Sequence, residues 1–117
     1  MRTINVVSLF SGAGGLDIGF KKAGFHTVWA TDVWDTACET LRINNMADEV
    51  VCADIRDINF TEIKDRHKTI DCVIGGPPCP PYSQTRHYLT EKQGGLNDKE
   101  AGFAVPEYFR AIKELAP

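Results

Sequence analysis

The feature that most constrains the fold is an apolar segment that runs directly into a glycine-rich turn. Residues 5–10 (NVVSLF) are apolar and rich in β-branched side chains, and SGAGG follows at residues 11–15. A short apolar run bounded by glycines is typical of a buried β-strand that ends in a tight turn. Residues 16–23 (LDIGFKKA) have the length and spacing of a short helix, which Gly24 is well placed to end. The chain is therefore predicted to begin with a strand, a glycine turn and a helix.

The same alternation continues along the chain. Further strands are predicted at residues 25–31, 50–53 and 70–74, and helices at 32–45 and 106–115, with one helical turn near 61–66. Strands that alternate with helices imply right-handed crossovers and a mostly parallel sheet in an α/β fold. At 117 residues the chain can form one small domain. Its last helix ends where such a fold would begin its next strand, so we expect an N-terminal portion of something longer, or one part of a split enzyme.

Composition and charge exclude several classes of protein. Hydrophobic residues at 43% and charged residues at 25% are ordinary for a soluble globular domain. Acidic residues outnumber basic ones 16 to 13, which argues against a strong nucleic-acid clamp in this segment alone. The start does not resemble a signal peptide and no apolar stretch is long enough to cross a membrane. We expect a cytoplasmic or nucleoid-associated protein that binds no membrane.

The four cysteines are not arranged for a metal site. They are Cys38, Cys52, Cys72 and Cys79, and none belongs to a C-x-x-C pair. We therefore expect no metal, and free thiols rather than disulfides in an intracellular chain.

Small and acidic residues follow the first three predicted strands, at the edge where parallel strands end. The glycines at 11–15 allow a ligand to approach the backbone closely, and amides at the start of the next helix favour an anionic group. Asp32 follows the second strand, where α/β folds place a carboxylate against ribose hydroxyls. Asp54 follows the third strand and could accept a hydrogen bond from an exocyclic amine. Each feature alone could serve a turn or a cap, but together they indicate a nucleoside-bearing cofactor with an anionic end.

The most unusual segment is GGPPCPPYS at residues 75–83, in which four prolines flank Cys79. Proline fixes φ and has no amide hydrogen, so this loop is expected to be stiff and to hold the thiol in one direction. A stiff thiol at the end of a strand suits nucleophilic attack, provided that its proton is removed. On these residues alone, a rigid turn with an incidental cysteine is the alternative. The other three cysteines are predicted to be structural.

These motifs together resemble the cytosine-carbon-5 DNA methyltransferases over nearly the whole chain. Residues 9–25 are similar to the first motif of that family, and residues 75–83 to its catalytic Pro-Cys motif. Residues 30–45 (ATDVWDTACETLRINN) and 53–55 (ADI) resemble its second and third motifs. Residues 97–117 are similar to the segment that follows its mobile loop. The order of the two main motifs and their separation also match.

The resemblance implies a Rossmann-like S-adenosylmethionine-dependent methyltransferase fold, truncated after the fourth strand and its following helix. It implies that the Cys79 thiolate adds to carbon 6 of a cytosine flipped out of duplex DNA, and that carbon 5 takes the methyl group of S-adenosylmethionine. Phe10 would pack on the adenine, Asp32 would hold the ribose, and Ser83 and Arg86 would contact the substrate. The cofactor-binding residues implied are Phe10, Ser11, Gly12, Gly14, Gly15, Leu16, Asp32, Val33, Asp54, Ile55, Gly76 and Pro78.

Four residues depart from the family pattern. The usual glutamine after the cysteine is Pro80, the usual phenylalanine before the serine is Tyr82, and the aromatic residue after the ribose acid is Val33. A family leucine beside the cofactor corresponds to Ala104. None of these changes removes the nucleophile or the ribose carboxylate.

The family also uses a glutamate, an arginine, a target-recognition region and a C-terminal segment that would follow residue 117. We therefore expect residues 1–117 to be the N-terminal part of the S-adenosylmethionine-binding catalytic domain, inactive alone and dependent on a C-terminal part or a partner chain. Two alternatives stay open at this stage. One is an RNA cytosine-5 methyltransferase, and the other is a non-catalytic cofactor-binding module of the same fold.

Overall fold

The computed structural model describes residues 3–77 and 102–117, in which a parallel sheet of four strands forms the centre. Every strand pair in it is parallel, and the strand order is β3-β2-β1-β4. The strands are β1 (Asn5–Leu9), β2 (His26–Asp32), β3 (Glu49–Cys52) and β4 (Cys72–Gly75). The helices are α1 (Gly15–Lys22), α2 (Asp35–Ile43), the 3-10 helix η1 (Ile55–Asp57), α3 (Phe60–His67) and α5 (Ala104–Leu115). The predicted α/β fold with a mostly parallel sheet is confirmed.

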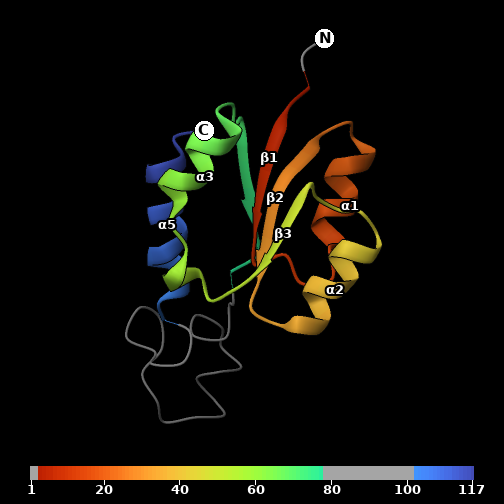
Figure 1. Ribbon diagram of the computed structural model, residues 1–117, viewed down its shortest axis with the longest axis horizontal. Helices are drawn as coiled ribbons and strands as arrows, with labels where there is room; N and C mark the ends of the chain where they lie inside the picture. The colour runs from red at the N-terminus through yellow and green to blue at the C-terminus, as the bar shows by residue number, and fades with distance from the viewer. Residues whose placement is uncertain (1–2, 78–101) are drawn as a thin grey trace, which may run out of the picture.

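The helices cover both faces of the sheet (Figure 1). Helices α1 and α2 lie on one face, and α3 and α5 lie together on the other. The chain moves outward from β1 through β2 to β3, and then returns to place β4 on the other side of β1. The strand order therefore reverses beside β1, and open α/β sheets bind their ligands at the carboxyl ends of the strands at such a reversal.

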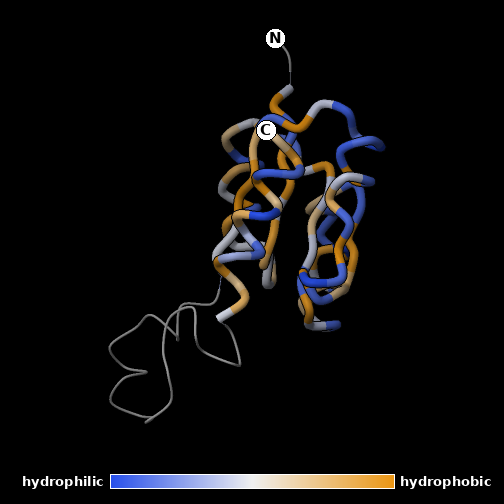
Figure 2. The backbone as a smooth tube through the Cα atoms, turned by 90° about the vertical axis from the view of Figure 1, so that its left-hand side faces the viewer, coloured by the Kyte–Doolittle hydropathy of each residue, from blue (hydrophilic) through white to orange (hydrophobic). Residues whose placement is uncertain are grey.

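The core explains why β1 carries apolar side chains on both of its faces. Val6, Val7 and Leu9 of β1 are fully buried because helices pack on both faces, so neither set of alternate side chains reaches solvent. Trp29 of β2 packs edge to face with Phe60 of α3, with ring centroids 6.4 Å apart. Along the helices, hydrophobic and hydrophilic residues alternate within each turn (Figure 2), as expected for helices with one buried face.

Three helices differ in extent from the sequence-based expectation. The helix expected over 32–45 begins only at Asp35, because Asp32 is the last residue of β2. The single turn expected near 61–66 is an eight-residue helix, which Asn59 begins by accepting a hydrogen bond from the Glu62 amide at 3.2 Å. Helix α5 begins at Ala104, so Pro106 lies in its first turn. None of the helices in the described ranges is both long and apolar enough to span a bilayer.

Candidate functional site

A pocket of about 360 Å³ opens at the carboxyl ends of the strands, where the strand order reverses. Its walls come from the carboxyl end of β2, from the segments that follow each of the four strands, and from the residue just before α5. The lining residues are Phe10, Gly12, Thr31, Asp32, Val33, Trp34, Ala53, Asp54, Ile55, Gly76 and Phe103. Aromatic and aliphatic walls with a few carboxylates are typical of a small-molecule site.

The glycine turn after β1 forms one wall and is held close to its neighbours. Gly12 and Gly14 have φ angles of 57° and 94°, in the left-handed region that favours glycine. The Ser11 amide donates to the carbonyl oxygen of Thr31 at 3.0 Å, which ties the turn to the end of β2. A Cβ atom on Gly14 would lie 3.0 Å from Cδ2 of Leu41 in α2, so a larger residue would push the turn away from this helix.

Asp32 connects the glycine turn to the start of the next loop. Its Oδ2 accepts a hydrogen bond from the Gly12 amide at 2.8 Å, and its Oδ1 accepts one from the Trp34 amide at 3.0 Å. Each carboxylate oxygen can accept two hydrogen bonds, so one acceptor position on each oxygen is available to a ligand hydroxyl. Asp32 therefore has a structural role in this pocket, because it joins the glycine turn to the loop after β2.

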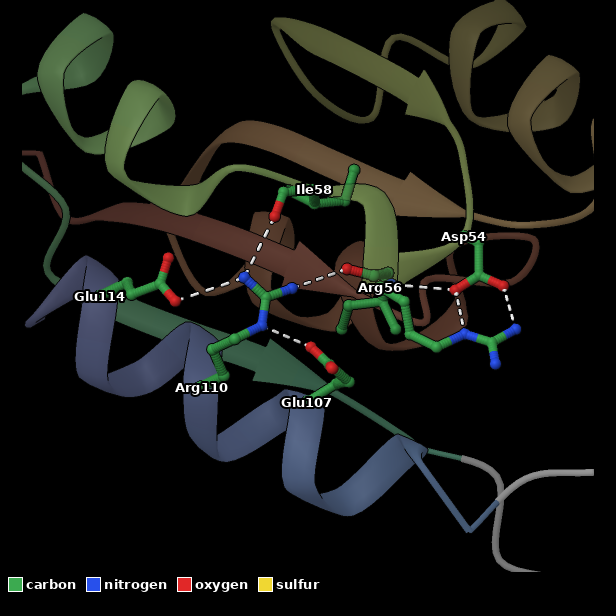
Figure 3. Close-up of polar contacts among 7 residues, drawn as sticks. Asp54, Arg56, Ile58, Glu107, Arg110 and Glu114 are labelled. Carbon is green, nitrogen blue, oxygen red and sulfur yellow. Dashed lines mark hydrogen bonds and ion pairs between the residues drawn. The ribbon is translucent and has the colours of Figure 1, made fainter. Parts of the chain in front are cut away.

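Asp54, which follows β3, also lines the pocket and is bound by Arg56 (Figure 3). Its Oδ1 accepts hydrogen bonds from the Arg56 amide at 2.9 Å and from Nε at 3.0 Å, and its Oδ2 accepts one from Nη2 at 2.6 Å. These hydrogen bonds hold the pKa of the Asp54 carboxyl below its ordinary value. The guanidinium carbon of Arg56 also lies 4.2 Å from the centre of the Phe103 ring.

The end of β4 is held tightly against β1 and α5. A Cβ atom on Gly75 would overlap the carbonyl oxygen of Leu9, so only glycine fits at this position. The Tyr108 hydroxyl donates to the Val73 carbonyl oxygen at 3.4 Å, and its ring stacks on Phe10 with centroids 6.5 Å apart. These contacts fix the position of Phe10 at the pocket and the direction in which the chain leaves β4.

The structure brings many of the predicted cofactor-binding residues together at this pocket. Those that line it are Phe10, Gly12, Asp32, Val33, Asp54, Ile55 and Gly76. Three further positions of the glycine turn and α1 lie elsewhere: Gly14 is buried against α2, and Gly15 and Leu16 line a shallower hollow along α1. Ser11 is occupied with hydrogen bonds to Ser8 and Thr31. The predictions for Pro78, Cys79, Ser83 and Arg86 lie outside the described residues.

Sequence reasoning missed two aromatic residues of the pocket. The sequence has Val33 where the family has an aromatic residue after the ribose acid. In the structure, Trp34, one position later, lines the pocket and is 72% exposed. Ala104 corresponds to a family leucine beside the cofactor. In the structure Ala104 is fully buried, and the neighbouring Phe103 lines the pocket. A tryptophan two positions after a strand-end aspartate was the signal available for the first. The sequence offered none for the second.

Two cysteines lie near the pocket as free thiols. The Cys38 thiol donates to the Asp32 carbonyl oxygen at 3.3 Å, and the Cys52 thiol donates to Oδ1 of Asp35 at 3.2 Å. Hydrogen bonding to Cys38 and Asp35 raises the pKa of Cys52 to about 12, so this thiol is unreactive. In the two described ranges, no group of three or more potential ligands is placed to hold a metal ion.

Comparison with known proteins gives consistent matches across the chain. The family described as C-5 cytosine-specific DNA methylase matches residues 4–117. The chain is 41% identical to the type II methyltransferase M.AquIA of Picosynechococcus, over 96% of this chain and 44% of that protein. It is 39% identical to the type II methyltransferase M.PspPI of Psychrobacter, over 99% of this chain and 26% of that protein. The chain thus spans less than half the length of these two relatives.

Solved structures show the same architecture. A crystal structure described as a DNA modification methyltransferase encoded within a prophage of E. coli matches with a TM-score of 0.75 and 31% identity. That match covers 98% of this chain and 30% of the solved chain. A mutant of DNMT2 from Spodoptera frugiperda matches with a TM-score of 0.57 at 18% identity, which supports the fold alone.

Proposed function

This chain belongs to the C-5 cytosine-specific DNA methylase family, and on that basis we propose that the protein transfers a methyl group from S-adenosylmethionine to carbon 5 of cytosine in DNA. The observation that carries the proposal is the match over residues 4–117, which includes both the pocket and the Pro-Cys segment. The relatives are named type II methyltransferases, which supports a role in restriction–modification.

The pocket suits S-adenosylmethionine in size and chemistry. Phe10, Ile55 and Phe103 supply apolar walls of the kind that an adenine ring packs against. Asp32 keeps acceptor positions for ribose hydroxyls while its backbone contacts hold it in place. The left-handed glycine turn exposes backbone next to the start of α1, where a carboxylate of the methionine portion would be favoured. When bound, the cofactor supplies an electrophilic methyl group.

Cys79 is proposed as the nucleophile, and its place in the sequence supports this. It follows Gly76, the lining residue directly after β4, by three positions. Its thiolate would form a bond to carbon 6 of the cytosine, and the displaced electron pair would make carbon 5 nucleophilic. Carbon 5 would then take the methyl group as the sulfonium S–CH3 bond breaks, with S-adenosylhomocysteine as the leaving group. Loss of the carbon-5 proton and of the cysteine sulfur would restore the aromatic ring. Ser83 and Arg86 are proposed to hold the target nucleotide.

The proposed substrate is duplex DNA from which the target cytosine is flipped out, because the reacting carbons are inaccessible inside a base-pair stack. The two relatives are more than twice as long as the matched region, and we propose that this additional length provides target recognition and completes the cofactor site. The 117-residue chain alone is then expected to be inactive. A cytoplasmic or nucleoid-associated location is proposed from this substrate.

Trapping of the covalent adduct tests the proposal. Duplex DNA with 5-fluorocytosine at candidate sites is incubated with S-adenosylmethionine and the full-length protein, because fluorine cannot leave as a proton and the adduct accumulates. We expect an adduct that resists denaturation, is lost in Cys79→Ser and is retained in the matched control Cys72→Ser. An adduct with fluorocytosine RNA but not with DNA would favour an RNA methyltransferase. No adduct with either would favour a non-catalytic module.

A further inference from the structure

Arg56 is the residue that connects two walls of the pocket contributed by distant parts of the chain. Asp54 follows β3, and Phe103 immediately precedes α5. The Arg56 side chain donates two hydrogen bonds to the Asp54 carboxylate, and its guanidinium carbon lies 4.2 Å from the centre of the Phe103 ring. The planar, delocalised cation is suited to both contacts at once, since it forms a bidentate pair with a carboxylate and stacks on an aromatic face.

The turn that carries Arg56 is itself fixed by Arg110 of α5 (Figure 3). Arg110 Nη2 donates to the Ile55 carbonyl oxygen at 2.9 Å, and Nη1 donates to the Ile58 carbonyl oxygen at 3.1 Å. Its guanidinium carbon lies 4.9 Å from the centre of the Phe60 ring. Arg110 thus holds the backbone of the turn that follows β3. The Arg56 side chain contacts the Asp54 and Phe103 side chains and orients them.

The position of Arg56 argues against a purely structural role. Its side chain is 55% exposed, and exposed ion pairs contribute little to global stability. The hydrogen bond that caps η1 comes from the Arg56 backbone amide, so it does not depend on the side chain. The two side-chain contacts described above are both with residues that line the pocket.

We propose that Arg56 is a positioning residue of the cofactor pocket, which orients the Asp54 carboxylate and the Phe103 ring so that the site selects a purine with a 6-amino group over one with a 6-oxo group. This rests on the proposed function, in which the pocket binds S-adenosylmethionine. A carboxylate fixed by Arg56 accepts a hydrogen bond from an amine at position 6, and it repels a carbonyl oxygen there. Without the Arg56 side chain, the carboxylate keeps only the hydrogen bond from the Arg56 backbone amide to Oδ1. Its other oxygen can then swing about this bond and accept instead from the N1–H group of a 6-oxo ring.

Binding of two product analogues tests the proposal in the full-length protein. The dissociation constants of S-adenosylhomocysteine and S-inosylhomocysteine, which differ at purine position 6, are measured by titration calorimetry. In Arg56→Gln we expect the affinity for the adenosyl compound to fall about tenfold, because the oriented hydrogen bond from its 6-amino group to the Asp54 carboxylate is lost. The affinity for the inosyl compound should change by less than about threefold. Arg56→Lys keeps the charge without the planar fork and should give an intermediate ratio.

Arg66→Gln is the matched control, since Arg66 has similar exposure and binds Glu49 at 2.8 Å outside the pocket. It should leave both dissociation constants unchanged. Equal weakening of both compounds in Arg56→Gln, or an adenosyl affinity within twofold of wild type, would overturn the role of Arg56 alone. If the wild-type protein binds neither compound, the proposed cofactor is wrong and the inference fails with it.

Discussion

Replacement of Gly75 by alanine tests how closely the end of β4 is packed against β1. Gly75 is the register partner of Leu9 in the parallel β1–β4 pair. An added Cβ would overlap the Leu9 carbonyl oxygen and would lie 3.0 Å from Cε2 of Tyr108. The main obstacle is backbone inside a buried strand, so it cannot move aside as the end of a flexible side chain could. The two strands must separate at this point.

The cost of Gly75→Ala follows from these contacts. Forcing one extra carbon into a well-packed core costs about 1–3 kcal/mol. Separation of the strands also weakens a hydrogen bond of the sheet, which adds about 0.5–1.5 kcal/mol. We therefore expect a loss of about 3 kcal/mol in the free energy of unfolding, which is a large share of the stability of a small domain.

The assay is urea denaturation followed by far-ultraviolet circular dichroism. Gly19→Ala is the matched control, because Gly19 lies within α1 and a Cβ there has no neighbour within 4 Å. This control should stabilise the chain by about 0.5–1 kcal/mol through the better helix propensity of alanine. A Gly75→Ala variant within about 0.5 kcal/mol of wild type would refute the packing argument.

Two further substitutions test the packing of the helices on the two faces of the sheet, one in α1 and one in α5. Asp17 is 1% exposed and burial raises its pKa, so its contribution to stability is present at low pH and is lost as the pH rises through the folded-state pKa. In urea denaturation, Asp17→Asn should therefore gain stability relative to wild type as the pH rises above about 4, the ordinary pKa of an aspartate, and a pH-independent difference would contradict this. Arg110→Met removes the hydrogen bonds to the Ile55 and Ile58 carbonyl oxygens and should cost about 2 kcal/mol in thermal or urea unfolding. An unchanged midpoint would show that α5 does not hold this turn.

The parts of the site that were predictable from the sequence are those set by local order along the chain. The carboxyl ends of parallel strands lie at one edge of the sheet whatever packs around them. The glycine turn after the first strand and the aspartates at the next two strand ends therefore lie at that edge. Asp32 and Asp54 therefore both line the pocket. The second hydrogen-bonding role of Asp32, toward the Gly12 amide, depends on how the two turns meet in space.

The parts that were not predictable depend on long-range packing. Phe103 reaches the pocket because α5 packs on α3 and Arg110 binds the turn after β3, and no local period indicates this. The extent of α3 was underestimated because its exposed residues are polar, while Phe60 and Ile63 alone face the core. Both features arise from contacts between segments far apart in the sequence.

The pocket at the strand ends, with Asp32 in its wall, is proposed to bind S-adenosylmethionine. The most direct test is the dissociation constant of S-adenosylhomocysteine for the full-length protein and for Asp32→Asn, with Asp48→Asn as a control, since Asp48 pairs with His26 away from the pocket. An asparagine side chain has one acceptor oxygen in place of two, so the account predicts a loss of about tenfold or more in affinity for Asp32→Asn, with Asp48→Asn unchanged. Equal affinity of the wild-type and Asp32→Asn proteins would contradict it.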